Sequence, residues 1–130
     1  MKVKYLIFVV VLFVMFSVIL TSCQNQTTTT QMTEPTDDVD LVLKLTAKNF
    51  SFSEESITVK KGQTVRIELT ITEGMHDWVL DEFSAATKQA SSGDTVTVVF
   101  TADKSGEFEY YCSVGNHRAQ GMIGTLIVEE

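Results

Sequence analysis

Residues 109–130, "EYYCSVGNHRAQGMIGTLIVEE", decide which kind of domain this chain forms. The stretch contains Cys112, His117 and Met122, and four residues separate each of them from the next. Calcium and magnesium prefer clustered oxygen ligands, whereas a thiolate, an imidazole and a thioether suit copper. The stretch therefore predicts a metal-binding loop, and such a loop needs a rigid scaffold on both sides.

The segments around this loop alternate apolar and polar residues with the period of a β-strand. In residues 57–71, every second residue from Val65 to Ile71 is apolar, and Gly62 marks a turn. Further strands are expected at residues 41–47, 77–83, 94–102, 106–112 and 124–130. The only helix that the sequence allows is short, at residues 84–90. This pattern predicts an all-β fold, either an antiparallel sandwich or a barrel.

The N-terminus has the features of an export signal. Lys2 and Lys4 precede an apolar run over residues 5–20, and residues 20–23 have the sequence LTSC. This junction resembles the cleavage site of bacterial lipoproteins, in which the cysteine becomes the lipid-modified first residue. We expect residues 1–22 to be a lipoprotein signal peptide and Cys23 to be lipidated. The alternative is an uncleaved membrane anchor. Both interpretations export the domain, to the outer face of the cell membrane or to the periplasm.

Residues 24–40 are polar and rich in threonine, and they contain the only proline, Pro35. A segment with so few apolar residues cannot form a core. We therefore expect residues 23–40 to comprise the lipidated cysteine and a flexible linker, and residues 41–130 to form one folded domain.

The charge and the cysteine count narrow the possible functions. The formal net charge is −7, and removal of Lys2 and Lys4 with the signal would make it −9. Nucleic-acid binding depends on basic side chains that neutralise phosphates, so we expect no nucleic-acid partner. If Cys23 carries lipid, Cys112 has no disulfide partner. An exported thiol of this kind must be buried, reactive or bound to a metal.

A fourth ligand can come from His76, the only other histidine. It lies in "TEGMHDWVL", residues 72–80, where a loop enters an expected strand. Loops at one end of a sandwich cluster, so His76 can meet the loop from Cys112 to Met122. Two imidazoles, one thiolate and a weak axial thioether form a blue-copper site. A structural zinc site more often has several cysteines, and a binuclear copper site needs a second bridging cysteine.

Ordinary roles for these residues stay open. Cys112 could be an inert buried thiol, Met122 a core residue, and the two histidines could bond to the backbone or cap a turn. A Cys–His nucleophile would need an oriented imidazole in a cleft, and only Asn116 in this loop could orient it. Each ordinary role explains one residue, whereas the metal site explains the ordered series together.

With these residues the domain resembles the cupredoxins, the small blue-copper proteins that include plastocyanin, azurin and auracyanin. The resemblance covers residues 41–130 and rests on "GMHDWVLDEF", "FTADKSGEFEYYCSVGNH" and "GMIGTLIVE". The cysteine–histidine–methionine spacing is most similar to that of auracyanin, rusticyanin and the phytocyanins. The resemblance implies a Greek-key sandwich that holds one copper ion at one end. Its ligands would be His76, Cys112 and His117, with Met122 axial.

Two positions depart from the family pattern. Many relatives have Pro-Gly before the loop histidine, where this chain has Gly115 and Asn116. Because asparagine tolerates left-handed backbone, we expect the loop shape to survive. The residue after the first histidine is often asparagine, and here it is Asp77. We expect Asp77 to lie in the second shell of the copper, where its backbone N–H can reach the Cys112 sulfur and its carboxylate adds negative charge.

The resemblance implies an electron carrier rather than an enzyme. We expect a monomer, tethered to the membrane by its lipid, that cycles copper between Cu(II) and Cu(I). Its partners would be redox proteins such as a cytochrome, an oxidase or a reductase. The electron would pass through the outer edge of His117, inside an apolar patch of Met75, Val114, Ala119 and Ile123. The acidic remainder would attract positively charged partners. The alternative function is carriage of Cu(I) for delivery to an oxidase.

Overall fold

The computed structural model describes residues 38–130, so the predictions for residues 1–22, for Cys23 and for most of the linker lie outside it. The described residues contain eleven strands, two short 3₁₀ helices and no α-helix. Among them, no helix is long and apolar enough to cross a membrane. The strands are β1 (Leu41–Lys48), β2 (Ser51–Phe52), β3 (Ser56–Lys60), β4 (Thr64–Ile71), β5 (Met75–His76), β6 (Val79–Leu80), β7 (Ala85–Ala86), β8 (Ala90–Ser91), β9 (Thr95–Thr101), β10 (Gly106–Tyr111) and β11 (Ile123–Glu129), and the 3₁₀ helices are η2 (Asp81–Phe83) and η3 (Arg118–Gln120).

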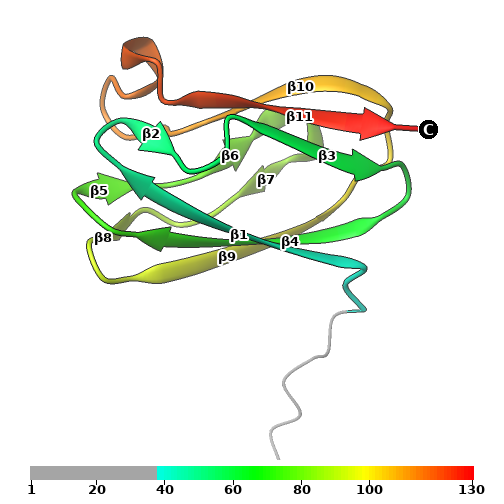
Figure 1. The fold of residues 1–130 in the computed structure, drawn as a ribbon, viewed down its shortest axis with the longest axis horizontal. Helices are drawn as coiled ribbons and strands as arrows, with labels where there is room; N and C mark the ends of the chain where they lie inside the picture. The colour runs from blue at the N-terminus through cyan, green and yellow to red at the C-terminus, as the bar shows by residue number, and fades with distance from the viewer. Residues whose placement is uncertain (1–37) are drawn as a thin grey trace, which may run out of the picture. The chain divides into compact units, whose positions relative to one another are not determined.

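The long strands form the two layers of a β-sandwich, as the alternating pattern predicts (Figure 1). One sheet has the strand order β2-β1-β4-β9, the other has the order β3-β11-β10-β6-β7, and β5 pairs with β8. Two of the pairings, β1 with β4 and β3 with β11, are parallel, so the sandwich is not purely antiparallel. The parallel pair β1–β4 arises because the chain passes through β3, in the other sheet, between these two strands.

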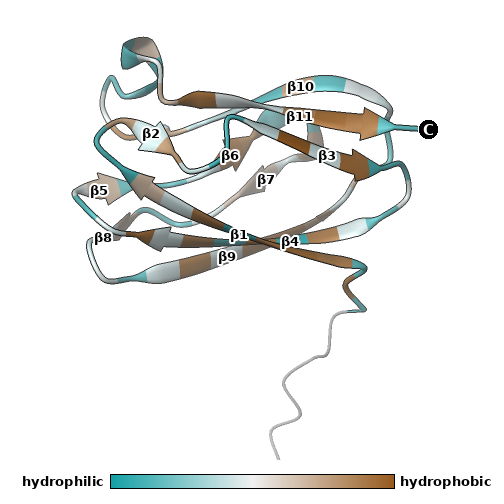
Figure 2. Cartoon of the chain, viewed as in Figure 1, coloured by the Kyte–Doolittle hydropathy of each residue, from teal (hydrophilic) through white to brown (hydrophobic). Residues whose placement is uncertain are grey.

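Strand β4 shows how the sequence builds the core. Its residues alternate strictly between half-buried and buried, and Val65, Ile67, Leu69 and Ile71 are fully buried. Each such side chain contributes about 1.5–3 kcal/mol when it leaves water. Figure 2 shows the same arrangement along the chain, with hydrophobic residues in the strands and hydrophilic residues in the turns. The prediction that Gly62 forms the preceding turn is also confirmed, since its φ is +90°.

Large aromatic rings fill the centre of the sandwich. The indole of Trp78 lies 5.9 Å from the ring of Phe100 and 5.4 Å from the ring of Tyr110, measured between centroids. The Tyr110 hydroxyl donates a hydrogen bond to the backbone carbonyl of Glu54. Tyr110 pairs across the strands with Gly124, where a Cβ would overlap the tyrosine ring. The glycine therefore makes room for a ring that ties β10 to β11.

The helix expected at residues 84–90 is wrong. These residues form β7 and β8 and the link between them. Ser84 has a left-handed backbone with φ of 50°, which ends η2. Thr87 then bonds to Trp78 twice, through its amide to the Trp78 carbonyl and through its Oγ1 to the Trp78 amide. These tertiary hydrogen bonds hold the segment extended, so local helix propensity does not decide its structure.

Candidate metal centre

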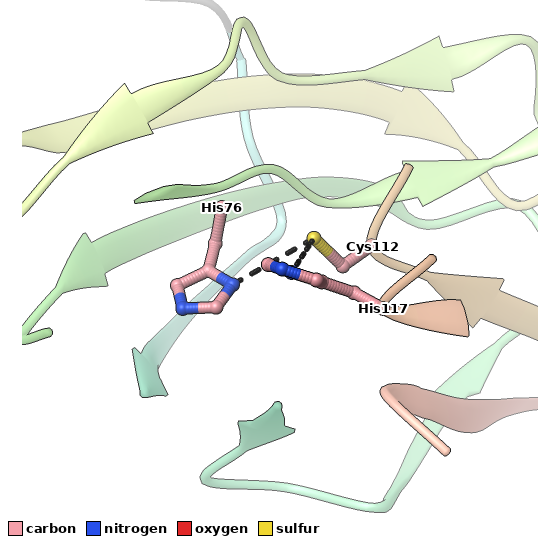
Figure 3. A group of neighbouring side chains, drawn as sticks. All are labelled: His76, Cys112 and His117. Atoms are coloured by element: carbon pink, nitrogen blue, oxygen red, sulfur yellow. Dashed lines mark hydrogen bonds between the residues drawn. The ribbon is translucent and has the colours of Figure 1, made fainter. Parts of the chain in front are cut away.

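Three possible ligands converge at one end of the sandwich (Figure 3). The sulfur of Cys112 lies 3.7 Å from Nδ1 of His76 and 3.5 Å from Nδ1 of His117. The ligand atoms of the three residues all lie within 4.8 Å of one another. The expectation that the segment around His76 meets the loop after Cys112 is therefore confirmed.

His76 is held by short strands on the rim of the sandwich. It occupies β5, which pairs with β8 through Ala90. Gly74 lies so close that a Cβ there would sit 3.2 Å from Nε2 of His76, and its φ of +79° also favours glycine. The Glu73 backbone carbonyl accepts a hydrogen bond from the imidazole. Burial, followed by the charge of His117, lowers the pKa of His76, which keeps the ring neutral as metal binding requires.

Cys112 comes directly after β10 and continues its alternation. Within this strand Tyr110 is buried and Tyr111 is half-exposed, so Cys112 again faces inward and is fully buried. Burial raises the pKa of the Cys112 thiol, while backbone N–H groups of Asp77 and Val114 donate to the sulfur and oppose that rise. A metal that binds the thiolate must therefore displace a proton from this site.

His117 lies in the loop, which is braced by its own backbone. Its amide donates to the Val114 carbonyl at 3.0 Å, and its carbonyl accepts from the Met122 amide at 3.0 Å. Before His117 the left-handed residue is Gly115, with φ of +51°, and after η3 it is Gly121, with φ of +92°. Asn116 does not have a positive φ, so the left-handed backbone that asparagine tolerates is not used at this position. The preceding glycine provides the turn, and the Asn116 side chain accepts a hydrogen bond from Gln120 instead.

Asp77 ties the two halves of the site together. The residue is buried, and its carboxylate accepts the backbone N–H of Ser113 at 2.6 Å and the Ser113 hydroxyl. Ser113 follows Cys112, so the bonds connect the His76 segment with the cysteine loop. Asp77 therefore has a structural role through its bonds to Ser113, in addition to the negative charge that the sequence led us to expect near the copper.

Met122 is fully buried beside the cluster. Its backbone carbonyl accepts the Cys112 amide at 3.1 Å, and its amide bonds to His117. These contacts bring the start of β11 next to both residues. They involve the backbone and not the thioether, so the axial role of Met122 stays a prediction.

The geometry fits a copper ion. A sulfur at about 2.3 Å and a nitrogen at about 2.0–2.1 Å from one metal lie about 3.5–3.8 Å apart at tetrahedral or trigonal angles. The sulfur–nitrogen distances of 3.5 and 3.7 Å are close to this value. One thiolate and two imidazoles are the equatorial donors of a blue-copper site. Since Cys112 is the only cysteine in the described residues, nothing there could bridge a second copper.

Of the four apolar residues expected around His117, Met75 and Val114 line the surface beside the cluster, whereas Ala119 and Ile123 are exposed but are not among the residues that line it. Met75 is 48% exposed and Ile123 41% exposed, and Val114 and Ala119 also reach the surface. An open hollow above the two histidines is lined by Asn49, Phe50, Glu73, Gly74, Met75, His76, Val114 and His117. The sequence did not indicate the Asn49–Phe50 turn, because it lies far from the metal-binding motifs. The only signal was an aromatic residue, Phe50, just beyond the strand expected at residues 41–47.

Comparisons with known proteins agree with this geometry. The sequence matches the family described as "Cupredoxin-like domain" over residues 8–128. It is also 35% identical over 78 residues to a nitrous-oxide reductase of Pseudomonas fluorescens, in an alignment that covers 56% of this chain. The chain spans only 12% of the length of that relative.

Solved structures of auracyanins have the same fold. Auracyanin B is 20% identical, with a TM-score of 0.63 over 71% of this chain and 91% of its own. Auracyanin A of Chloroflexus aurantiacus, described as a blue copper protein, is 22% identical, with a TM-score of 0.59 over 68% of this chain and 98% of its own. The dithionite-reduced auracyanin of Roseiflexus castenholzii is 24% identical, with a TM-score of 0.61 over 69% of this chain and 97% of its own. At these identities the likeness shows the sandwich fold.

Proposed function

The chain belongs to the family of cupredoxin-like domains, and we propose that it is a blue-copper electron carrier rather than an enzyme. The family and the His–Cys–His cluster are consistent with one bound copper ion. The proposed ligands are His76, Cys112 and His117 in the plane and Met122 on the axis. The observation that carries the proposal is the convergence of a buried thiol and two imidazole Nδ1 atoms at 3.5 and 3.7 Å.

The chain's contribution is to keep these ligands in one arrangement. A bound copper ion supplies one-electron redox chemistry between Cu(II) and Cu(I). His76 is held by β8 and by the Glu73 carbonyl, and Cys112 by its backbone bond to Met122. Because the protein fixes the ligands, little rearrangement accompanies a change of charge, and that favours fast electron transfer.

The route for the electron is through His117. This residue is half-buried, and it lines the open hollow together with Met75 and Val114. We propose that a redox protein docks on this apolar surface, which includes Ala119 and Ile123. The acidic remainder of the domain would attract a partner with a positive surface.

The competing function is copper delivery to an oxidase. A carrier of cargo copper generally needs an exposed, exchangeable site, whereas Cys112 and Met122 are fully buried here. The two functions are separated by cycling the copper-loaded full chain electrochemically and, separately, mixing it with a copper-free acceptor protein. An electron carrier should cycle reversibly with fast self-exchange and retain its copper. Transfer of copper to the acceptor, without fast self-exchange, would favour delivery.

The tether is a separate proposal, supported by the LTSC junction at residues 20–23. We propose that residues 1–22 are removed, that Cys23 is lipidated, and that residues 23–40 link the membrane to the exported domain at residues 41–130. Mass spectrometry of the native protein should find a diacylated chain beginning at Cys23. An intact N-terminal Met1 would instead support the uncleaved anchor.

A further inference from the structure

The turn between β1 and β2 has an unusual residue. Lys48 and Ser51 pair across the hairpin, and the two residues between them, Asn49 and Phe50, have φ of 44° and 60°. Two-residue hairpins of this left-handed type favour asparagine followed by glycine. A bulky phenylalanine in the left-handed region is disfavoured by clashes of its side chain with the backbone. An interaction of the ring itself must offset this cost.

The ring of Phe50 packs on a proposed copper ligand. It meets the His117 imidazole edge to face, with centroids 4.7 Å apart and an interplanar angle of 89°. On the same imidazole, the second ring contact is with His76, whose ring centroid lies 5.0 Å away. Phe50 is 44% exposed, so burial in the core does not account for its position. The contact of Phe50 with His117 is therefore the interaction that can offset the cost of its left-handed backbone.

The two histidines are oriented by different means. His76 is 3% exposed, and the Glu73 carbonyl accepts a hydrogen bond from its ring. His117 is half-buried in a loop, and Phe50 supports its ring from the side of the hollow. Groups that contact metal ligands fix the orientation of those ligands and tune the metal. Aromatic packing therefore does for His117 what a hydrogen bond does for His76.

We propose that Phe50 is a positioning residue for His117. The strained turn holds the phenyl ring at a right angle against the imidazole, which keeps the imidazole turned toward Cys112. The same ring forms one wall of the hollow and so limits access of small molecules to the ligands. The consequence for copper rests on the proposed function, whereas the effect on the ring exists in the metal-free protein as well.

The first test uses metal-free full-length protein labelled with ¹³C-histidine. Because the chain has two histidines, only His76 and His117 give signals, and His76 is an internal control. Phe50→Gly suits the turn and removes the ring. Phe50→Leu keeps apolar bulk without the aromatic edge, and Phe50→Tyr keeps the edge. We expect ¹³C relaxation to show a more mobile His117 ring in the Gly and Leu variants, a wild-type ring in the Tyr variant, and an unchanged His76 in all three.

The second test measures copper release from the loaded full chain to a chelator. We expect release to be about two- to tenfold faster in Phe50→Gly and close to wild type in Phe50→Tyr. A His117 ring that is equally rigid without Phe50, or equally mobile in the Gly and Tyr variants, would overturn the proposal whether or not copper transfers electrons. If the ring loosens as expected but the chain does not cycle electrons, the proposed function fails and the positioning role stands.

Discussion

The aromatic centre of the sandwich and its metal end are neighbours in the chain, but they are built by different means. Trp78, Phe100 and Tyr110 are fixed by ring packing within or beside regular strands. Two residues before Trp78 lies His76, and two after Tyr110 lies Cys112, both held by short pairings and loop hydrogen bonds.

The fold and the metal site use neighbouring positions in the chain, and yet each can be changed without the other. Along β10 the inward side holds Phe108, which is half-buried, and Tyr110, which is buried, and the same alternation places the buried Cys112 at the metal end. We therefore expect changes in the aromatic centre to alter stability and to spare copper binding. Changes at the metal end should alter the copper and leave the fold intact.

The largest effect on the core side is expected from Gly124→Ala. The new Cβ would overlap the ring of Tyr110, which pairs with this position across β10 and β11. Overpacking of this kind costs about 1–3 kcal/mol, and the Tyr110 ring has little room to move because it is fully buried and its hydroxyl is bonded to the Glu54 carbonyl. Chemical denaturation of the full chain should show the loss, while copper stoichiometry stays the same. Equal stability of the variant would show that the strands shift easily.

Tyr110→Phe tests the same region through the pH dependence of the free energy of unfolding. Burial, then the charges of Glu54 and Glu55, raise the pKa of Tyr110 above its ordinary value of about 10. The folded state therefore keeps the phenol proton at a pH where the unfolded chain loses it. The raised pKa of Tyr110 stabilises the folded state fully below pH ~10. Above pH ~10 its contribution to the free energy of unfolding decreases by about 1.4 kcal/mol per pH unit.

The measurement compares denaturation of wild type and Tyr110→Phe across this pH range, so that titration of lysines cancels. Wild type should be more stable near neutral pH, because its hydroxyl bonds to the Glu54 carbonyl, and the advantage should shrink above pH ~10. A constant difference would mean that the tyrosine titrates normally in the folded state.

On the metal side, Met122 gives the sharper comparison, because it is both buried in the core and a proposed axial ligand. Met122→Leu should still bind copper but raise the reduction potential by on the order of 60 mV, equivalent to 1.4 kcal/mol for one electron. Loss of a weak axial donor disfavours Cu(II) more than Cu(I). Met122→Gln should lower the potential, because an oxygen donor favours Cu(II). Voltammetry that finds no shift in Met122→Leu, with reduced stability in Met122→Gln, would assign Met122 to the core alone.

Asp77→Asn should have the smallest effect. The amide can still accept the Ser113 N–H and can donate to the Ser113 hydroxyl, so the link between the two halves of the site survives. Removal of the negative charge should raise the potential by about 30 mV, or ~0.7 kcal/mol, because the two hydrogen bonds from Ser113 already offset part of that charge. Asp77→Ala, which also removes the hydrogen bonds, is the matched comparison and should weaken copper binding. Equal potentials for wild type and Asp77→Asn would show that the structural link is the only role of Asp77.

The sequence predicted the long strands because each buries one face. The alternation in β4 was sufficient to place Val65 and Ile67 on one face, and the structure buries both. It could not predict β7 and β8, because those strands depend on the hydrogen bonds between Thr87 and Trp78, which exist only after the chain has folded. The parallel pairings likewise follow from the path of the whole chain.

The cluster of His76, Cys112 and His117 was predictable because few residue types bind copper and the chain has few of them. Phe50 was not, because nothing in its local sequence relates it to a histidine 67 positions later (117 − 50). The left-handed turn at Gly115 was not predictable for a similar reason, since glycine and asparagine both tolerate left-handed backbone and only the folded loop distinguishes them.

The central claim is that the Cys112 thiolate binds a single copper ion together with two histidines. The most direct measurement is the visible absorption of the full chain during titration with Cu(II), beside the Cys112→Ser variant. We predict an intense thiolate-to-copper band that saturates at about one copper per chain in the wild type. The band should be absent in Cys112→Ser, whose β-sheet circular dichroism should match that of the wild type. A wild-type chain without the band, or a Ser variant that retains it, would contradict the account.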